Sequence, residues 1–433
     1  MTVSACLWLG LFPLLQFGSF HTVTHDKWIC MLVLTGLTLA GFLADAVMRR
    51  LSRPRLLPLL FCGGLLLWTV LSCLFSPYPG SPWWLGTGRR EGLATQLCYL
   101  ALFFLFSFSK VGKKTVLTAA GYGFLVFFAV VLIQRAGGNP FGLYPEGSGY
   151  EFAPDFQGTI GNVDMCSAYL VILCSLFLPE LVGVFRSSSR PSGAEGTVSS
   201  SKKIFSFLYT CLLLVSLAAA VYLLFTIHVF SGQLALAVLV AVVLVRLLPK
   251  KARLPVLLLL LAAVLLLVWF WPGAETGDLW ELHEILRGRP QLSFGSNRVA
   301  VWVYSAGLAQ ERLLTGGGSD TFELRFNRYI GDNGLVVPAS QGDVPLPAYF
   351  DNPHNEYIAH LVNHGLPALL LFAGLILLLV FLRPRTGTAR SPALLTPCAA
   401  AVLCYAVQAF FSFSVCLVAP MFWVIAGMCA AEK

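Results

Sequence analysis

The sequence predicts an all-α integral membrane protein with about twelve transmembrane helices and a large, partly helical extracytoplasmic loop. Of its 433 residues, 57% are hydrophobic and 12% are charged, and the mean hydropathy is +0.77. Soluble domains carry about 25% charged residues, so this chain needs lipid as part of its solvent. The net charge of +8 comes from short basic clusters between apolar runs, which argues against nucleic acid as a partner.

Apolar runs of about 20 residues, enough to cross the hydrocarbon core as helices, recur along the chain. The predicted spans lie near residues 5–20, 28–47, 56–75, 92–108, 115–134, 163–185, 204–226, 229–248, 254–271, 356–382, 393–411 and 414–430. The chain therefore divides into residues 1–271 with nine spans, a hydrophilic segment 272–353, and residues 354–433 with three spans. Its 12 cysteines lie inside apolar runs and indicate neither a disulfide framework nor a zinc site.

Basic residues follow every even-numbered span and set the expected orientation. They are Arg49, Arg50, Arg53 and Arg55; Lys110, Lys113 and Lys114; Arg186, Arg190, Lys202 and Lys203; Arg246, Lys250, Lys251 and Arg253; and Arg383, Arg385 and Arg390. Such connections face the cytoplasm, so we expect a multi-pass protein of the plasma or inner membrane with both termini cytoplasmic. Segments 76–91, 135–162 and 272–353 then lie on the extracytoplasmic face, which is the expected active face.

Segment 272–353 is too long for an ordinary connection and indicates a functional loop. Helices are predicted over 279–287, 297–314 and 320–329, with Gly-Gly-Gly-Ser at 316–319 breaking the chain. The first is amphipathic and suits the bilayer surface. The second repeats apolar residues at helical spacing (Val299, Val303, Ala306, Leu313). We expect Ser296 to cap the second helix, and Asp320 with Glu323 to form a capping box on the third.

His354 stands where the hydrophilic loop re-enters the membrane. Asn352 is expected to cap a helix whose first residue is Pro353, which places His354 in the first turn. The field at a helix start disfavours imidazolium, whereas Asp351 favours it, so the sequence leaves the direction of the pKa shift open. An interfacial polar residue without a chemical role is an equally good interpretation of His354 from the residues alone.

His360 and His364 follow at i, i+4 spacing on the same predicted helix. A zinc site needs a third ligand, and the HExxH pattern is absent. The pattern therefore favours a polar helix face near the membrane boundary, and no metal is predicted.

Arginine, not lysine, dominates the predicted outer side, where Lys27 is the one lysine. The arginines are Arg89, Arg90, Arg135, Arg287, Arg289, Arg298, Arg312, Arg325 and Arg328. A planar guanidinium can bind two phosphate oxygens at once, so a lipid pyrophosphate is the expected anion. The alternative is pairing with local acids (Glu91, Glu281, Glu284, Glu311 and Glu323), which we expect for Arg312 and Arg287.

Three other places concentrate polar residues at the membrane edge. Arg298 opens a predicted helix with Trp302 one turn later, and Arg89 and Arg90 precede a span beside Trp83 and Trp84. Gly-Thr-Ile-Gly-Asn-Val-Asp (158–164) leads into the sixth span with Asn162 and Asp164. A simple helix cap is the favoured interpretation of Asn162.

These pieces together resemble the O-antigen ligase and polymerase superfamily of bacterial envelope polysaccharide enzymes. The most specific likeness is His354-Asn355, nine residues, then Gly365. Residues 297–322 are similar to the family's Arg-x3-Trp helix and Gly-rich turn, 158–164 to its Gly-Asn span entry, and 86–93 to a Gly-Arg-x-Glu-Gly-Leu element. Two positions depart from the pattern: Ser231-Gly232-Gln233 lacks the arginine of a common Ser-Arg-Gly turn, and Asp164 replaces a common Asn.

The resemblance implies a C-type (GT-C-like) glycosyltransferase that moves a glycan from an undecaprenyl-pyrophosphate donor to a sugar hydroxyl of a glycan or glycolipid acceptor, without metal or cofactor. It implies catalytic roles for His354, as the group that orients or deprotonates the hydroxyl, and for Arg298, which would stabilise the leaving pyrophosphate as the anomeric carbon inverts. Donor or glycan contacts are expected from Arg89, Arg90, Arg325, Arg328, Asn162, Asp164, Asn355 and Trp302.

Two further classes of function stay open. A flippase or transporter of lipid-linked glycans needs polar residues within the spans and repeated halves, whereas here Asp45 and Glu180 lie near span ends and no repeat is visible. A non-catalytic partner in polysaccharide assembly is favoured if the missing arginine is essential. Ligase and polymerase differ only in the acceptor, and the sequence does not separate them.

Overall fold

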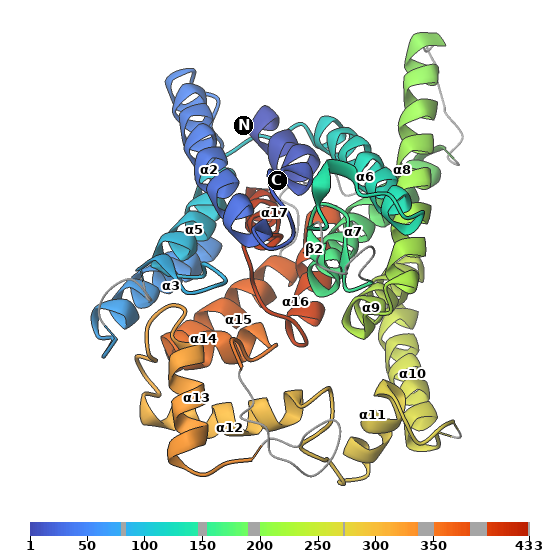
Figure 1. Cartoon of the computed structure of the whole chain (residues 1–433). Helices are drawn as coiled ribbons and strands as arrows, with labels where there is room; N and C mark the ends of the chain where they lie inside the picture. The colour runs from blue at the N-terminus through green and yellow to red at the C-terminus, as the bar shows by residue number, and fades with distance from the viewer. Residues whose placement is uncertain are drawn as a thin grey trace.

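Helices form almost all of the secondary structure in the computed structural model, which describes residues 1–78, 84–145, 154–188, 200–271, 273–336, 350–381 and 396–431 (Figure 1). Trp83, Arg190, Arg383, Arg385, Arg390 and the side chain of Lys202 lie outside this description. A pair of two-residue strands, β1 (Phe156–Gln157) and β2 (Gly161–Asn162), precedes the sixth predicted span. The all-α fold class is confirmed.

Seven described helices are long and apolar enough to cross a membrane, judged by length and composition. They are α2 (Val23–Val47), α3 (Leu56–Leu74), α6 (Lys113–Arg135), α7 (Val163–Ser188), α8 (Ser200–Thr226), α9 (Phe230–Leu247) and α10 (Lys250–Trp269). Each coincides with a predicted span, including the break between α8 and α9. The chain is therefore a polytopic membrane protein.

The other predicted spans are shorter helices in the described residues. They are α1 (Thr2–Cys6) with its π and 3-10 continuation to Leu14, α5 (Leu93–Ser107), α15 (Leu366–Phe381), α16 (Pro397–Ala409) and α17 (Ala419–Ala431). The first prediction, 5–20, runs too far, because the helix ends at Leu14. At 1.5 Å per residue, a helix of 13 residues such as α17 is about 20 Å long, short of the roughly 30 Å core.

The short C-terminal helices α16 and α17 lie in the interior of the bundle, whereas the long apolar helix α10 lies at its edge. In Figure 1, α16 and α17 lie in the middle of the view, where α17 packs on α5 and α16 on α7 and α9. In contrast, α10 lies along the edge with its leucines exposed, which suits contact with lipid. The segment between α16 and α17, residues 410–418, is not helical and carries Phe413 into the interior.

The hydrophilic segment folds into α11 (Asp278–Leu286), α12 (Arg298–Glu311) and α13 (Phe322–Asp332), as predicted. The two capping predictions are wrong. Asn297, in the left-handed conformation, occupies the cap of α12 instead of Ser296, and Thr321 occupies that of α13. The Asp320 carboxylate instead accepts hydrogen bonds from the backbone and hydroxyl of Thr87, a residue far away in the sequence.

The apolar face of α12 also differs from the predicted stripe. Val303 and Leu313 are 54% and 43% exposed, whereas Val301 and Leu308 are buried against Phe326 of α13. Val362, on the following helix, completes this small apolar cluster. The outer helices are thus packed together and joined to the segment that carries His354.

The predicted span 356–382 is broken at Gly365 into α14 (Glu356–His364) and α15. Gly365 has φ 84° and ψ 174°, a backbone region open essentially to glycine alone. A Cβ there would lie 2.0 Å from the carbonyl oxygen of Leu314. The next residue, Leu366, donates its N–H to the carbonyl of Leu313 (2.8 Å), so the end of the α12 segment is fastened to this break.

The glycines of 316–319 fasten the same two segments from the other side. The N–H of Gly317 donates to the carbonyl of Val362 (3.2 Å), and that of Gly318 donates to Asn363 (2.8 Å). These are carbonyls of the last turn of α14, which have no partner within the helix. The glycine turn predicted as a chain break therefore also ends α14.

Replacing Gly365 by alanine should destabilise the protein by at least about 2 kcal/mol, because strain in the backbone adds to the clash with Leu314. Gly331→Ala is the matched control, since a Cβ at Gly331 meets nothing within 4 Å and its helix favours alanine. Apparent melting temperatures in detergent measure both. Equal melting of the two variants would contradict this account of the turn.

Candidate functional site

One aromatic ring contacts both the candidate histidine and an arginine. The ring of His354 meets Phe413 edge-on, with centroids 5.0 Å apart, and the Arg89 guanidinium carbon lies 4.4 Å from the centroid of the same Phe413. These residues come from the loop before α14, the segment between α16 and α17, and the segment before α5. Three distant parts of the chain thus converge.

His354 does not lie in the first turn of a helix, which corrects the sequence prediction. Asn355, not Asn352, caps α14, because its Oδ1 accepts the N–H of Ile358 (3.1 Å). Asn352 instead accepts the N–H of His354 (2.9 Å) in an Asx turn. This turn holds His354 at φ 47°, a conformation that few residues other than glycine adopt.

The environment of His354 keeps its imidazole neutral at pH 7. Burial, followed by the charges of Arg298 and Arg89, lowers its pKa to about 4, while Asp351 acts in the opposite direction. Burial is the largest cause, which explains why the sequence left the direction open. Among the described residues the buried Nδ1 of His354 has no hydrogen-bond partner, so it is available as an acceptor.

Both arginines near His354 are paired with carboxylates. Arg89 Nε donates to a carboxylate oxygen of Asp351, and Arg298 Nη2 lies 3.9 Å from Asp164 Oδ2. All four side chains are partly exposed. The two arginines thus retain access to solvent, and an anionic ligand can compete with the carboxylates for them.

The backbone positions of Asp164 and Arg298 follow from local structure. Asn162 Oδ1 accepts the N–H groups of Asp164 (2.9 Å) and Met165 (3.4 Å), so the simple capping interpretation of Asn162 is confirmed. Trp302, one turn after Arg298, donates its indole N–H to the carbonyl of Pro353 (2.9 Å). Trp302 therefore links α12 to the backbone next to His354.

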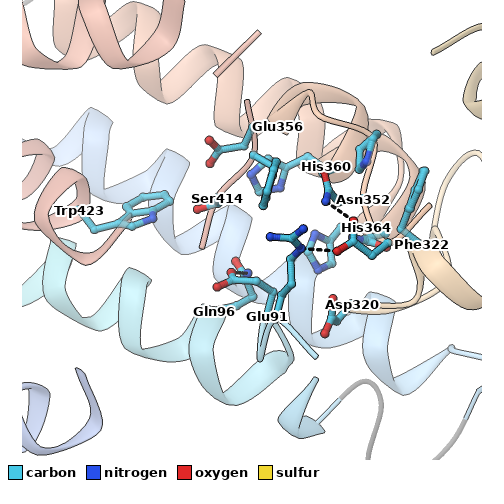
Figure 2. Close-up of a pocket in the computed structure, with 16 residues that line it drawn as sticks. Glu91, Gln96, Asp320, Phe322, Asn352, Glu356, His360, His364, Ser414 and Trp423 are labelled. Atoms are coloured by element: carbon cyan, nitrogen blue, oxygen red, sulfur yellow. Dashed lines mark hydrogen bonds and ion pairs between the residues drawn. The ribbon is translucent and has the colours of Figure 1, made fainter. Parts of the chain in front are cut away.

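A polar cavity of about 60 Å³ adjoins this cluster on the Arg89 side. Figure 2 shows Glu91, Asp320, Glu356, His360 and His364 around it. Each carboxylate is held by neighbours: Glu91 accepts from the Tyr99 hydroxyl (2.8 Å) and the N–H of Cys416 (2.9 Å), and Glu356 accepts from the Tyr405 hydroxyl (2.9 Å).

Burial raises the pKa of two carboxyls in this cavity that lie outside the membrane helices. It raises the pKa of Glu91 well above its usual value, and that of Asp320 to about 6. Hydrogen bonds from Thr87 oppose the shift at Asp320. The cavity is therefore acidic in composition, unlike the arginine-bearing side of the site.

Sequence reasoning missed this cavity, although one signal was present. Glu356, His360 and His364 recur at i, i+4 and i+8, which places three polar groups on one face of α14. The expectation of a polar face was correct for His360 and His364, but this face is buried and lines a cavity. Glu91 and Asp320 had been assigned to arginine pairing and to a cap, and nothing local in the sequence indicates otherwise.

Several predicted contact residues lie elsewhere. Arg325 is buried and donates to the carbonyl of Val362 (2.6 Å), with Glu311 3.8 Å away, so it joins α13 to α14. Arg328 is 71% exposed and pairs with Asp332 on its own helix. Neither lines the cavity, because one is occupied within the scaffold and the other faces solvent.

Other arginines bind backbone or aromatic groups. Arg90, at φ 61°, places its guanidinium 5.5 Å from the ring centroid of Trp28, away from Arg89. The prediction that Arg312 and Arg287 pair with acidic side chains is wrong, because both donate to backbone carbonyls. Arg312 donates to the carbonyls of Gly316 and Phe75, and Arg287 to that of Trp269.

The fold and the site together define a polytopic membrane protein with a partly buried His–Arg cluster at the junction of its outer helices and its apolar bundle. Residues 212–373 match the family model described as O-antigen ligase, which confirms the resemblance to that superfamily. The matched segment includes Arg298, Trp302, His354 and Gly365, whereas Arg89 and Asp164 lie before it. No curated protein matches the chain.

The pKa of His354 makes a prediction about stability. Below its unfolded value near 6.5, the unfolded chain binds a proton that the folded protein, with a pKa of about 4, does not, so acidification through this range destabilises the fold. Carboxyl groups with a raised pKa, such as Asp320, have the opposite effect, because the folded protein binds their protons more tightly than the unfolded chain. The informative quantity is therefore the difference in pH dependence between the wild type and a variant.

His354→Gln should therefore lose less stability than the wild type between pH 7 and 5.5, by on the order of 1 kcal/mol. Melting curves in detergent at each pH provide the measurement, with the exposed His25→Gln as control. A wild-type pH dependence unchanged in His354→Gln would show that His354 is not held neutral by the fold.

Proposed function

We propose that the protein is a metal-independent, inverting glycosyltransferase that moves a glycan from an undecaprenyl-pyrophosphate donor to a sugar hydroxyl. The family match supports an O-antigen ligase- or polymerase-like activity in general. The observation that carries the finer proposal is a neutral His354 with a free buried Nδ1, close enough to Arg298 and Arg89 for both to depress its pKa.

The two arginines suit a diphosphate. In the proposed complex the diphosphate oxygens replace Asp164 as the partner of Arg298 and Asp351 as the partner of Arg89. A doubly charged group with several acceptor oxygens competes well with a carboxylate for planar guanidinium donors. The bound anion also offsets the positive field at His354. Its pKa then rises from about 4 towards neutrality, where a general base works best.

The reaction is then a single displacement. The acceptor hydroxyl oxygen forms a bond to the anomeric carbon, while the bond from that carbon to the phosphate oxygen breaks and its electrons leave with the diphosphate. His354 takes the hydroxyl proton, and Arg298 and Arg89 stabilise the charge on the leaving group. In this proposal Arg89 supplies the cation that the Ser231-Gly232-Gln233 turn lacks.

The active face is proposed to be extracytoplasmic, in a plasma or inner membrane with both termini cytoplasmic. Two contacts support this orientation. The Met1 ammonium pairs with Asp45 (2.9 Å), close to the basic cluster that begins at Arg49, and Met428 near the C-terminus shares a small cavity with Lys110. His354 and Arg298 belong to the segments that carry no such cluster.

The alternatives are less well supported. A transporter of lipid-linked glycans needs a polar path through the bundle, whereas the clustered polar groups described above lie where the outer helices meet it. A non-catalytic assembly partner would not need a histidine held neutral beside two arginines. In cells without the protein, loss of transfer product with accumulation of extracytoplasmic donor supports the enzyme, whereas donor trapped on the cytoplasmic leaflet supports the flippase.

His354→Ala should reduce glycan transfer by about 10²–10⁴-fold, the usual contribution of a positioned general base. Purified protein in liposomes, supplied with lipid-linked glycan and acceptor, gives the rate, and the exposed His25→Ala is the control. Substantial transfer by a normally folded His354→Ala protein would remove His354 from the mechanism.

Arg298→Lys should lower transfer by about tenfold to a hundredfold although the charge is kept, because an ammonium group cannot bind two oxygens in a plane. Arg328→Lys is the matched control, since Arg328 is exposed and paired with Asp332. The same liposome assay applies. If both lysine variants retain full activity, Arg298 does not bind the diphosphate.

A further inference from the structure

The acidic cavity beside Arg89 has a chemistry opposite to that of a phosphate site. Its lining includes the carboxyl groups of Glu91, Asp320 and Glu356, none of which forms an ion pair within the described residues. The cation in the lining, Arg89, is engaged by Asp351. Within the described residues the lining thus offers an anionic group no cation that is not already paired, so the cavity does not extend the diphosphate site.

The cavity also presents polar atoms that have no partner. His360 and His364 are 8% and 3% exposed, and the Nδ1 of each is buried without a hydrogen bond. The amide oxygen of Asn363 is in the same state. Since buried polar groups are normally satisfied, these atoms indicate a bound polar group, and the Asn363 oxygen requires one that can donate a hydrogen bond.

The lining also contains unpartnered donors, among which the indole of Trp423 can only donate. The indole N–H of Trp423, which is 2% exposed, has no partner, and Figure 2 places this side chain on the far side of the cavity from His364. A ligand that satisfies Trp423 and the acceptors must both accept and donate. Phosphate only accepts and ammonium only donates, whereas a hydroxyl does both.

Aromatic rings complete the lining. Phe322, Phe413 and Trp423 contribute to the walls between the polar groups. The space of about 60 Å³ holds a few groups of the size of water, so one hydroxyl-bearing edge of a ring fits without rearrangement. Polar acceptors and donors between aromatic faces, at this size, match the edge of a sugar.

We propose that this cavity is a subsite for the hydroxyl edge of an uncharged sugar, and that it rejects sugars bearing a carboxylate. The inference rests on the proposed function, because it places sugar beside the diphosphate site with Arg89 at the boundary. Phe413 contacts both parts of the site: Arg89 lies over its ring, and His354 forms a T-shaped pair with the same ring. The sugar belongs either to the donor glycan or to the acceptor.

The first test measures binding without turnover. Methyl glucoside and methyl glucuronide are titrated onto the purified protein in detergent, with saturation-transfer NMR as the readout. The glucoside should bind at least tenfold more tightly than the glucuronide. Equal binding of the two, or binding of neither, would overturn the proposal, the latter meaning that the cavity holds water only.

A variant localises the binding. His360 has no recorded hydrogen bond and packs against Phe372 with ring centroids 4.3 Å apart, so His360→Phe keeps an aromatic ring and removes the nitrogens. The glucoside dissociation constant should rise roughly 3- to 10-fold, the effect of one or two hydrogen bonds. The exposed His25→Phe should leave it unchanged. An unaltered constant in His360→Phe would overturn the assignment.

Kinetics separate the two sources of sugar and the two proposals. In the liposome assay, His360→Phe should raise the KM of the acceptor if the subsite binds the acceptor, and of the lipid-linked donor if it binds the donor glycan. If His360→Phe raises neither KM, the proposed subsite is wrong, even if the wild-type protein transfers glycan normally. Conversely, glucoside binding that depends on His360 in a protein with no transfer activity would leave the subsite standing and reject the proposed function.

Discussion

The site depends on a backbone fastening between the end of the α12 segment and the break after α14. Leu366 binds the carbonyl of Leu313, and Gly317 and Gly318 bind the last carbonyls of α14. The indole of Trp68 on α3 donates to the carbonyls of Leu314 and His364 together, so the apolar bundle holds the same joint. At position 365 only glycine permits the close approach to the carbonyl of Leu314. This glycine therefore helps to fix how the outer helices meet the membrane helices.

This joint explains why residues far apart in the sequence meet. With α12 fastened at its C-terminal end, the bond from Trp302 to the carbonyl of Pro353 holds the other end, and Arg298 is carried to the edge of α7. The Asx turn of Asn352 and the cap formed by Asn355 hold the loop before α14 in place. The His–Arg cluster is therefore a property of the packing and not of any one segment.

The sequence predicted what depends on local patterns and failed where partners are distant. Apolar runs and basic clusters were enough to find every helix of the bundle in the described residues, since span length and charge bias are local. The roles of Glu91, Asp320 and Arg325 depend on groups such as Thr87 or Val362, which no spacing rule connects to them. Likewise, burial decided the pKa of His354, and burial follows from the three-dimensional packing.

The arginines near His354 are paired, whereas the neighbouring cavity is lined by carboxyl groups without an ion pair in the described residues. Each arginine near His354 already holds a carboxylate, Asp351 for Arg89 and Asp164 for Arg298. Such pairs limit the cost of keeping guanidinium groups at the edge of the bundle without a ligand. Asp164, where the resembling family commonly has asparagine, gives Arg298 a charged partner at 3.9 Å, a separation longer than a tight ion pair. A loose partner is the kind that an incoming diphosphate can replace, and both carboxylates are partly exposed to solvent. Aspartate at position 164 is therefore compatible with the proposed chemistry. It gives Arg298 a charged partner in the absence of donor, and the N–H groups of Arg298 stay available to a diphosphate.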